Sequence, residues 1–97
     1  MPGVVVVLYN AEVVVDLRPV INDPQGITVR DGLRSLGFTQ VRSARVGKVI
    51  RLELDAASPD AARAAVVDMC ERLLSNPVIE DYSIESLTAV EAGSPTG

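Results

Sequence analysis

Cys70 is the strongest nucleophile by type in this sequence and therefore the first candidate for chemistry. A reactive cysteine needs a neighbouring base or positive charge that lowers the pKa of its thiol. The 97 residues contain no histidine, which excludes Cys-His and Ser-His pairs and removes a common ligand of zinc and non-haem iron. Cys70 lies on an expected helix, and because no histidine can act as its base, we expect a buried structural thiol.

Carboxylates could act as metal ligands or as acid–base pairs, but their spacing here selects neither role. We interpret the candidates as solvent-exposed helix caps and strand ends: Asp23, Asp31, Asp55, Glu80 and Asp81. The glycines form neither a G-x-x-x-x-G-K-[ST] nor a G-x-G-x-x-G phosphate-binding pattern. We therefore expect no catalytic residue, no metal site and no cofactor-binding site in this chain.

Composition narrows the range of partners. Thirteen acidic and nine basic residues give a formal net charge of −4, and Tyr9, Phe38 and Tyr82 are the only aromatic residues. Nucleic-acid binding usually requires a basic patch interleaved with aromatics, so no nucleic-acid partner is expected. The apolar run that ends at Tyr9 is too short to span a membrane, so the chain is expected to be soluble and cytoplasmic.

The first half of the chain predicts a strand and a helix. Residues 12–18 alternate apolar and polar side chains, as in a half-buried strand, and residues 4–9 form either a separate strand or part of the same one. Asp23 and Pro24 match a helix cap and first turn. The predicted helix covers residues 24–36, with an apolar stripe at Val29, Leu33 and Leu36.

The second half repeats this pattern with an additional strand. Alternation predicts strands at 41–46 and 49–54, joined by a tight hairpin at Gly47-Lys48. Ser58-Pro59 opens a second helix at 59–74, and a last strand follows at 78–87.

The resulting order, β-α-β-β-α-β, is that of the ferredoxin-like α+β fold. Such a fold has one antiparallel sheet with both helices on one face. We assign residues 1–87 to a single domain and residues 88–97 to a flexible tail. Val14 and Val49 fall on the opposite face of the sheet, which predicts dimerisation through the sheet.

The predicted helices and strands leave two polar segments without a clear structural role. Arg45-Val46-Gly47-Lys48 places two cations around the predicted hairpin turn, where they are either solvated or in contact with an anion or partner. The second segment is Asn76-Pro77-Val78-Ile79-Glu80-Asp81-Tyr82, which combines a helix stop with apolar and acidic strand residues. It is longer than a segment that only ends a helix.

Four segments in this order resemble the PurS family, the small subunit of phosphoribosylformylglycinamidine synthase. The resemblance covers about Glu12 to Ile84, and residues 1–11 add a valine-rich segment that the family pattern does not require. The four segments are Asp23-Pro24-Gln25-Gly26, Arg45-Val46-Gly47-Lys48, Met69-Cys70-Glu71-Arg72-Leu73-Leu74 and Asn76-Pro77-Val78-Ile79-Glu80-Asp81-Tyr82.

The resemblance implies a subunit of a three-chain, ATP-dependent ligase of purine (IMP) biosynthesis. A glutaminase subunit (PurQ) would release ammonia, and a synthetase subunit (PurL) would use ATP and Mg²⁺ to activate the amide of formylglycinamide ribonucleotide. The small subunit would supply no catalytic residue. It would act as a homodimer or tetramer that bridges the other two and supports ammonia transfer.

The residues nearest the ends of the predicted sheet are the candidates for partner contacts: Arg45, Lys48, Glu80 and Asp81. An alternative from another class remains open, a small ligand-binding regulatory domain of the ferredoxin-like type. In that case Gly26 or Gly47 would belong to the effector-binding loop at a dimer interface.

Overall fold

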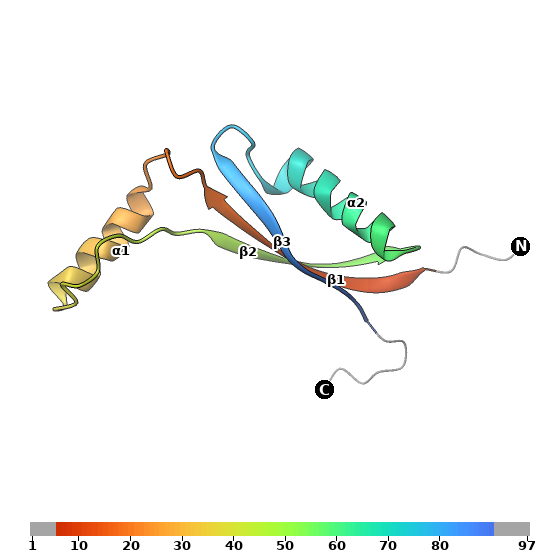
Figure 1. The fold of residues 1–97 in the computed structure, drawn as a ribbon, viewed down its shortest axis with the longest axis horizontal. Helices are drawn as coiled ribbons and strands as arrows, with labels where there is room; N and C mark the ends of the chain where they lie inside the picture. The colour runs from red at the N-terminus through yellow and green to blue at the C-terminus, as the bar shows by residue number, and fades with distance from the viewer. Residues whose placement is uncertain (1–5, 91–97) are drawn as a thin grey trace, which may run out of the picture.

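A computed structural model describes residues 6–90 of the chain (Figure 1). The strands form one antiparallel sheet in the order β2-β1-β3. The elements are β1 (Val7–Leu17), α1 (Pro24–Ser35), β2 (Lys48–Ala56), α2 (Pro59–Met69), a π-helical turn η1 (Cys70–Leu74) and β3 (Glu80–Ala89). The predicted α+β class, with an antiparallel sheet and two helices, is confirmed.

β1 is the central strand and carries most of the core. Its alternation buries Tyr9, Ala11, Val13 and Val15 on one face, where β-branched side chains pack well. The strand is continuous from Val7 to Leu17, so the valine-rich segment belongs in part to the same strand as residues 12–17.

α2 covers this apolar face of the sheet. The Ser58 hydroxyl accepts a hydrogen bond from the Ala61 amide at 3.1 Å, as the predicted cap requires. Ala62, Val66 and Cys70 are fully buried and pack against β1 and its neighbours. The predicted helix over 59–74 is thus confirmed, although its last five residues adopt π-helical rather than α-helical bonding.

The face of the sheet opposite α2 is mainly polar. Glu12 on β1 lies opposite Arg51 on β2, with 3.5 Å between the carboxylate oxygen and Nε. The adjacent pair, Val14 and Val49, is apolar, but Val49 remains exposed. The two valines that suggested a covered second face therefore stand in largely polar surroundings.

α1 projects beyond the end of the sheet instead of packing on it (Figure 1). We expected both helices to cover one face of the sheet. Within this chain only α2 does so. The apolar stripe of α1 is consequently open: Val29 is 44% exposed and Leu36 is 76% exposed.

The predicted strand at 41–46 and the hairpin at Gly47-Lys48 are not formed. Residues 41–47 have no regular secondary structure. β2 begins at Lys48 and pairs with β1, and no other strand pairs with residues 41–47 in the described part of the chain. The Arg34 guanidinium instead holds the segment beside α1, donating to the carbonyl oxygens of Thr39 at 2.7 Å and Val41 at 2.9 Å.

β3 begins and ends two residues later than predicted, at Glu80 and Ala89. Thr88 and Ala89, which the sequence placed in the tail, therefore belong to the sheet. The tail residues 91–97 lie outside the described part of the chain. Within residues 6–90, no helix is both long and apolar enough to cross a membrane.

Candidate partner interface at the end of the sheet

The four charged residues singled out by the sequence lie at one end of the sheet. Lys48 opens β2, whereas Glu80 and Asp81 open β3, and all three pair with the last residues of β1. Arg45 approaches the same end from the segment that leads into β2. The structure thus brings together residues that are up to 36 positions apart in the sequence.

The Arg45 guanidinium forms hydrogen bonds within its own chain. Its Nη2 lies 3.2 Å from the carbonyl oxygen of Leu17, 2.9 Å from that of Arg18 and 3.4 Å from that of Ile21. These contacts join the chain that leaves β1 to the chain that enters β2. Arg45 therefore fixes the path of the backbone, a role that its position beside a predicted turn did not reveal.

Asp23 makes the second connection between these two segments. Its side chain is buried, and Oδ1 accepts from the Gly26 amide at 2.9 Å while Oδ2 accepts from the Val46 amide at 2.8 Å. These two amides, together with the nearby charge of Arg45, lower the pKa of Asp23 below its ordinary value. Sequence reasoning identified the helix cap but missed the bond to Val46.

Gly26 and Gly47 allow the two segments to approach this closely. A Cβ atom on Gly26 would lie 2.2 Å from the Ala44 carbonyl oxygen, and one on Gly47 would lie 1.9 Å from Oδ1 of Asp16. Both distances are too short for a side chain. The first two segments of the resemblance, around Asp23-Pro24 and around Arg45, therefore form one structural unit, which we call the clamp (residues 23–26 and 44–47).

Glu80 and Asp81 organise the other side of this end. The Glu80 carboxylate accepts from the Asn76 amide at 2.7 Å, and Asp81 lies 3.5 Å from Nε of Arg18. The Arg18 guanidinium also donates to the Pro77 carbonyl oxygen, and the Arg18 amide donates to the Ile79 carbonyl oxygen at 2.8 Å. Arg18, which was not among the sequence candidates, thus ties the 76–81 turn to the end of β1.

Lys48 differs from its neighbours. Its side chain is exposed, and none of the hydrogen bonds or ion pairs found within residues 6–90 involves its ammonium group. Of the four candidates, Lys48 is therefore the one whose charge is available to a partner without loss of a contact inside this chain.

A shallow pocket lies beside this end of the sheet, between β3 and η1. Its lining includes Arg18, Cys70, Glu71, Ser75, Asp81 and Tyr82. Burial raises the pKa of the Cys70 thiol, and the nearby Glu71 carboxylate raises it further. Glu71 also raises the pKa of the Tyr82 phenol. Both groups are thus protonated at neutral pH, which opposes nucleophilic chemistry by Cys70.

Comparison with known proteins assigns the chain to a family. The PurS family model, described as phosphoribosylformylglycinamidine (FGAM) synthase, matches residues 10–88. Subunit PurS of phosphoribosylformylglycinamidine synthase from Synechocystis is 42% identical over 83 residues, which span 86% of this chain and 82% of the relative.

Comparison with solved structures supports the same family. PurS from Thermus thermophilus has a TM-score of 0.77 at 36% identity, with 87% of this chain and 99% of that chain covered. A chain of the PurLQS structure from Thermotoga maritima has a TM-score of 0.73 at 33% identity, with 93% of this chain and 100% of that chain covered. Because sequence and structure agree over most of its length, the chain belongs to the PurS family of phosphoribosylformylglycinamidine synthase subunits.

Proposed function

We propose that this chain is the non-catalytic small subunit that joins the glutaminase (PurQ) and the synthetase (PurL) of phosphoribosylformylglycinamidine synthase in the cytoplasm. The observation that carries the proposal is the match to PurLQS from Thermotoga maritima, which extends over the whole of the matched chain. In this role, PurS acts as a homodimer or larger assembly.

The proposed role follows from the chemistry of the reaction. The glutaminase releases ammonia, and the synthetase uses ATP and Mg²⁺ to activate the amide of formylglycinamide ribonucleotide, which ammonia converts to the amidine. Ammonia reaches the second site efficiently only if both enzymes are held together and the path excludes bulk water. A small subunit can supply this alignment without contributing a reacting group, in keeping with a protonated, buried Cys70.

The charged end of the sheet is the proposed contact with a partner subunit. Lys48 offers an exposed cation next to the clamp, and Asp81 is an exposed anion on β3. Charged groups at the rim of an interface mainly change association rates and their dependence on salt. Contacts at this end would therefore affect assembly more than the chemical steps.

Charge reversal at Lys48 tests this contact. Lys48→Glu is expected to weaken co-sedimentation of this chain with the glutaminase and synthetase at low salt, since it places a negative charge at the proposed interface. The matched control is Arg63→Glu, the same reversal at an exposed position of α2. Equal assembly of wild type and Lys48→Glu at every salt concentration would rule out a contact at Lys48.

The alternative of a ligand-binding regulatory domain makes a different prediction. An effector that binds the native state should raise the melting temperature of the isolated chain in a concentration-dependent way. The clamp glycines that suggested an effector loop lie instead where a side chain would clash, at Gly26 with the Ala44 carbonyl oxygen and at Gly47 with the Asp16 carboxylate. The structure therefore favours the assembly role.

A further inference from the structure

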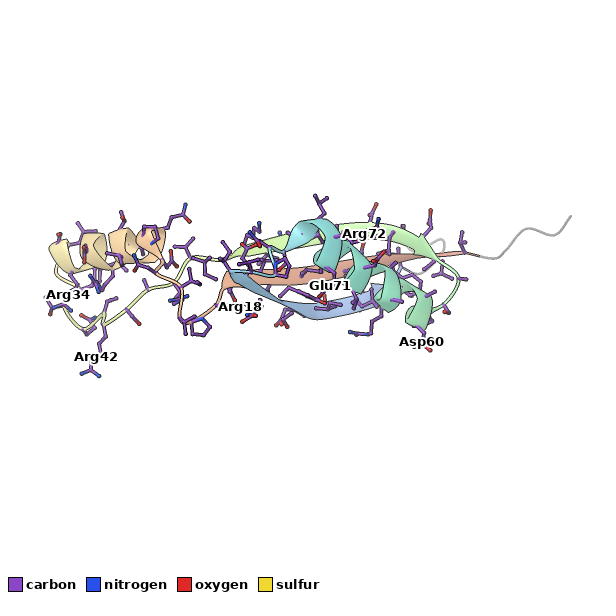
Figure 2. The ribbon with its side chains drawn as sticks, turned by 90° about the horizontal axis from the view of Figure 1, so that it is seen from above. Arg18, Arg34, Arg42, Asp60, Glu71 and Arg72 are labelled. Atoms are coloured by element: carbon purple, nitrogen blue, oxygen red, sulfur yellow. The ribbon has the colours of Figure 1, made fainter. Side chains whose placement is uncertain are left out.

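The pocket between β3 and η1 carries an excess of negative charge. Its volume is about 330 Å³, which is at the lower end of the range for ligand pockets. Figure 2 shows Glu71 on the side of η1 that faces β3. The charged groups in the wall of the pocket are one guanidinium and three carboxylates, a net charge of −2: Arg18, Glu71, Glu80 and Asp81. The pocket therefore attracts a positively charged group.

The arrangement of the carboxylates selects the kind of cation. Within residues 6–90, no three acidic, thiol or imidazole side chains come close enough together to hold a metal ion. The carboxylates instead point to separate places: Glu80 accepts from the Asn76 amide at 2.7 Å, and Asp81 lies 3.5 Å from Nε of Arg18. A guanidinium group has five N–H donors in a planar fork and can bond to separated oxygen atoms at once.

Ser75 places an unused hydroxyl in this pocket. The residue is only 6% exposed, and none of the side-chain hydrogen bonds found within residues 6–90 involves its hydroxyl. Every fully buried side-chain nitrogen or oxygen in the same part of the chain has a partner. The Ser75 hydroxyl must therefore reach the surface of the pocket that Ser75 lines. A donor that enters the pocket gives this hydroxyl the hydrogen bond that it lacks.

The rest of the wall suits the remainder of an arginine side chain. Pro77 and the half-buried ring of Tyr82 line the pocket. The Glu71 carboxylate lies beside the Tyr82 hydroxyl, where it raises the pKa of the phenol. The methylene groups of an arginine can cover the proline ring, and its guanidinium can stack on an aromatic face. A lysine ammonium has the charge but not the planar shape.

The segments around the pocket also present apolar side chains to the surface. Leu73 on η1 is 82% exposed, and Val78 in the turn before β3 is 77% exposed. Asn76 fixes this turn, because its side-chain oxygen accepts from the Val78 amide at 3.1 Å and its carbonyl oxygen accepts from the Glu80 amide at 2.7 Å. A preformed turn loses little conformational entropy on binding, and exposed apolar groups of this kind mark protein interfaces.

We propose that this pocket receives an arginine side chain from one of the two larger subunits of the synthase. The guanidinium donates to the carboxylates of Glu71 and Asp81 and to the Ser75 hydroxyl. Leu73 and Val78 pack on apolar residues around that arginine, so that the interface has an apolar part and a buried charged contact. The inference rests on the proposed function, because it specifies where and by what chemistry a partner binds.

Glu71→Gln tests the charge of the pocket and keeps the size of the side chain. Loss of one charge-assisted bond is expected to weaken binding to the larger subunit about tenfold. The measurement is a titration of the labelled chain with the glutaminase, with the synthetase and with both together, in the presence of glutamine, ATP and Mg²⁺. The matched control is Glu53→Gln, at an exposed position of β2, which should bind as wild type does.

The possible results of this titration have different meanings. Wild-type affinity of Glu71→Gln in all three titrations would overturn the proposal while the bridging role stands. Dissociation of the homodimer by Glu71→Gln, seen in sedimentation, would assign the pocket to a second copy and would also overturn it. Failure of the wild-type chain to bind either subunit would reject the bridging role, and the inference with it.

NMR spectra of the isotope-labelled chain test the pocket without the other subunits. The probe is N-acetylarginine amide, which carries the guanidinium and no terminal charge, and the control probe is the citrulline analogue, which has the same shape and no charge. The arginine probe alone is expected to shift the amide resonances of the lining residues: Arg18, Glu71, Ser75, Asp81 and Tyr82. Equal shifts with both probes, or none at these residues, would overturn the proposal whether or not the bridging role holds.

Discussion

Asp23 joins the two segments of the clamp. Its carboxylate accepts from Gly26 within α1 and from Val46 across the clamp. The sequence predicted the first of these bonds because an aspartate before a proline is a strong helix cap. It could not predict the second, since Val46 is 23 positions away and only the fold brings its amide close.

Asp23→Asn is expected to lower stability and remove part of its pH dependence. The amide replaces one accepting oxygen with a donor that cannot bond to the Val46 or Gly26 amide. In wild type the pKa of Asp23 is lowered by folding. Its contribution to stability is therefore complete above the unfolded pKa of about 3.9 and is lost as pH falls through the lower folded pKa.

Denaturant unfolding followed between neutral and acidic pH checks this expectation. The difference in stability between wild type and Asp23→Asn should be largest near neutral pH and shrink as the pH falls below about 4. Asp55→Asn, at an exposed position of β2, is the matched control. A constant difference across this pH range would show that the Asp23 carboxylate does not make the clamp.

Cys70 is expected to contribute packing and no chemistry. Its side chain is fully buried against β1, so Cys70→Ala should cost about 1–2 kcal/mol of unfolding free energy. The glutamine-driven activity of the assembled synthase should survive below the melting temperature of the variant. Complete loss of activity in a variant that folds and assembles normally would show a chemical role for the thiol.

At the level of elements, local signals predicted more than contacts between distant segments. Both helices begin at the expected aspartate–proline and serine–proline steps, and β1 follows its alternating pattern. The alternation at 41–46 predicted a strand, but alternation does not specify a pairing partner. The strand predicted there was therefore wrong: residues 41–47 lead directly into β2 and pair with no other strand among the described residues.

The packing of α2 on β1 forms the hydrophobic core. Val66 is fully buried between them, so Val66→Ala should cost about 2 kcal/mol through lost contacts and a residual cavity. Val20→Ala is the control, because this valine is exposed in the turn after β1, and it should change stability by less than about 0.5 kcal/mol. Similar losses in the two variants would contradict this description of the core.

At the scale of the whole molecule, the chain consists of the sheet with α2 on one face and of α1, which projects beyond the end of the sheet past the clamp (Figure 1). The sequence placed the four charged candidates at the ends of the sheet, and the structure brings them to one end. It did not reveal that Arg45 bonds to its own chain, whereas Lys48 remains exposed. Which charges are available to a partner depends on long-range backbone geometry, and a linear pattern does not encode that.

The role proposed for this subunit is to align two enzymes for ammonia transfer. The direct measurement compares glutamine-driven with ammonia-driven turnover of the reconstituted synthase, with and without this chain. Omission of the chain is expected to reduce glutamine-driven turnover sharply, because ammonia released by a detached glutaminase is lost to bulk water. Turnover with saturating ammonia should fall much less. Equal glutamine-driven turnover with and without the chain would contradict the bridging role.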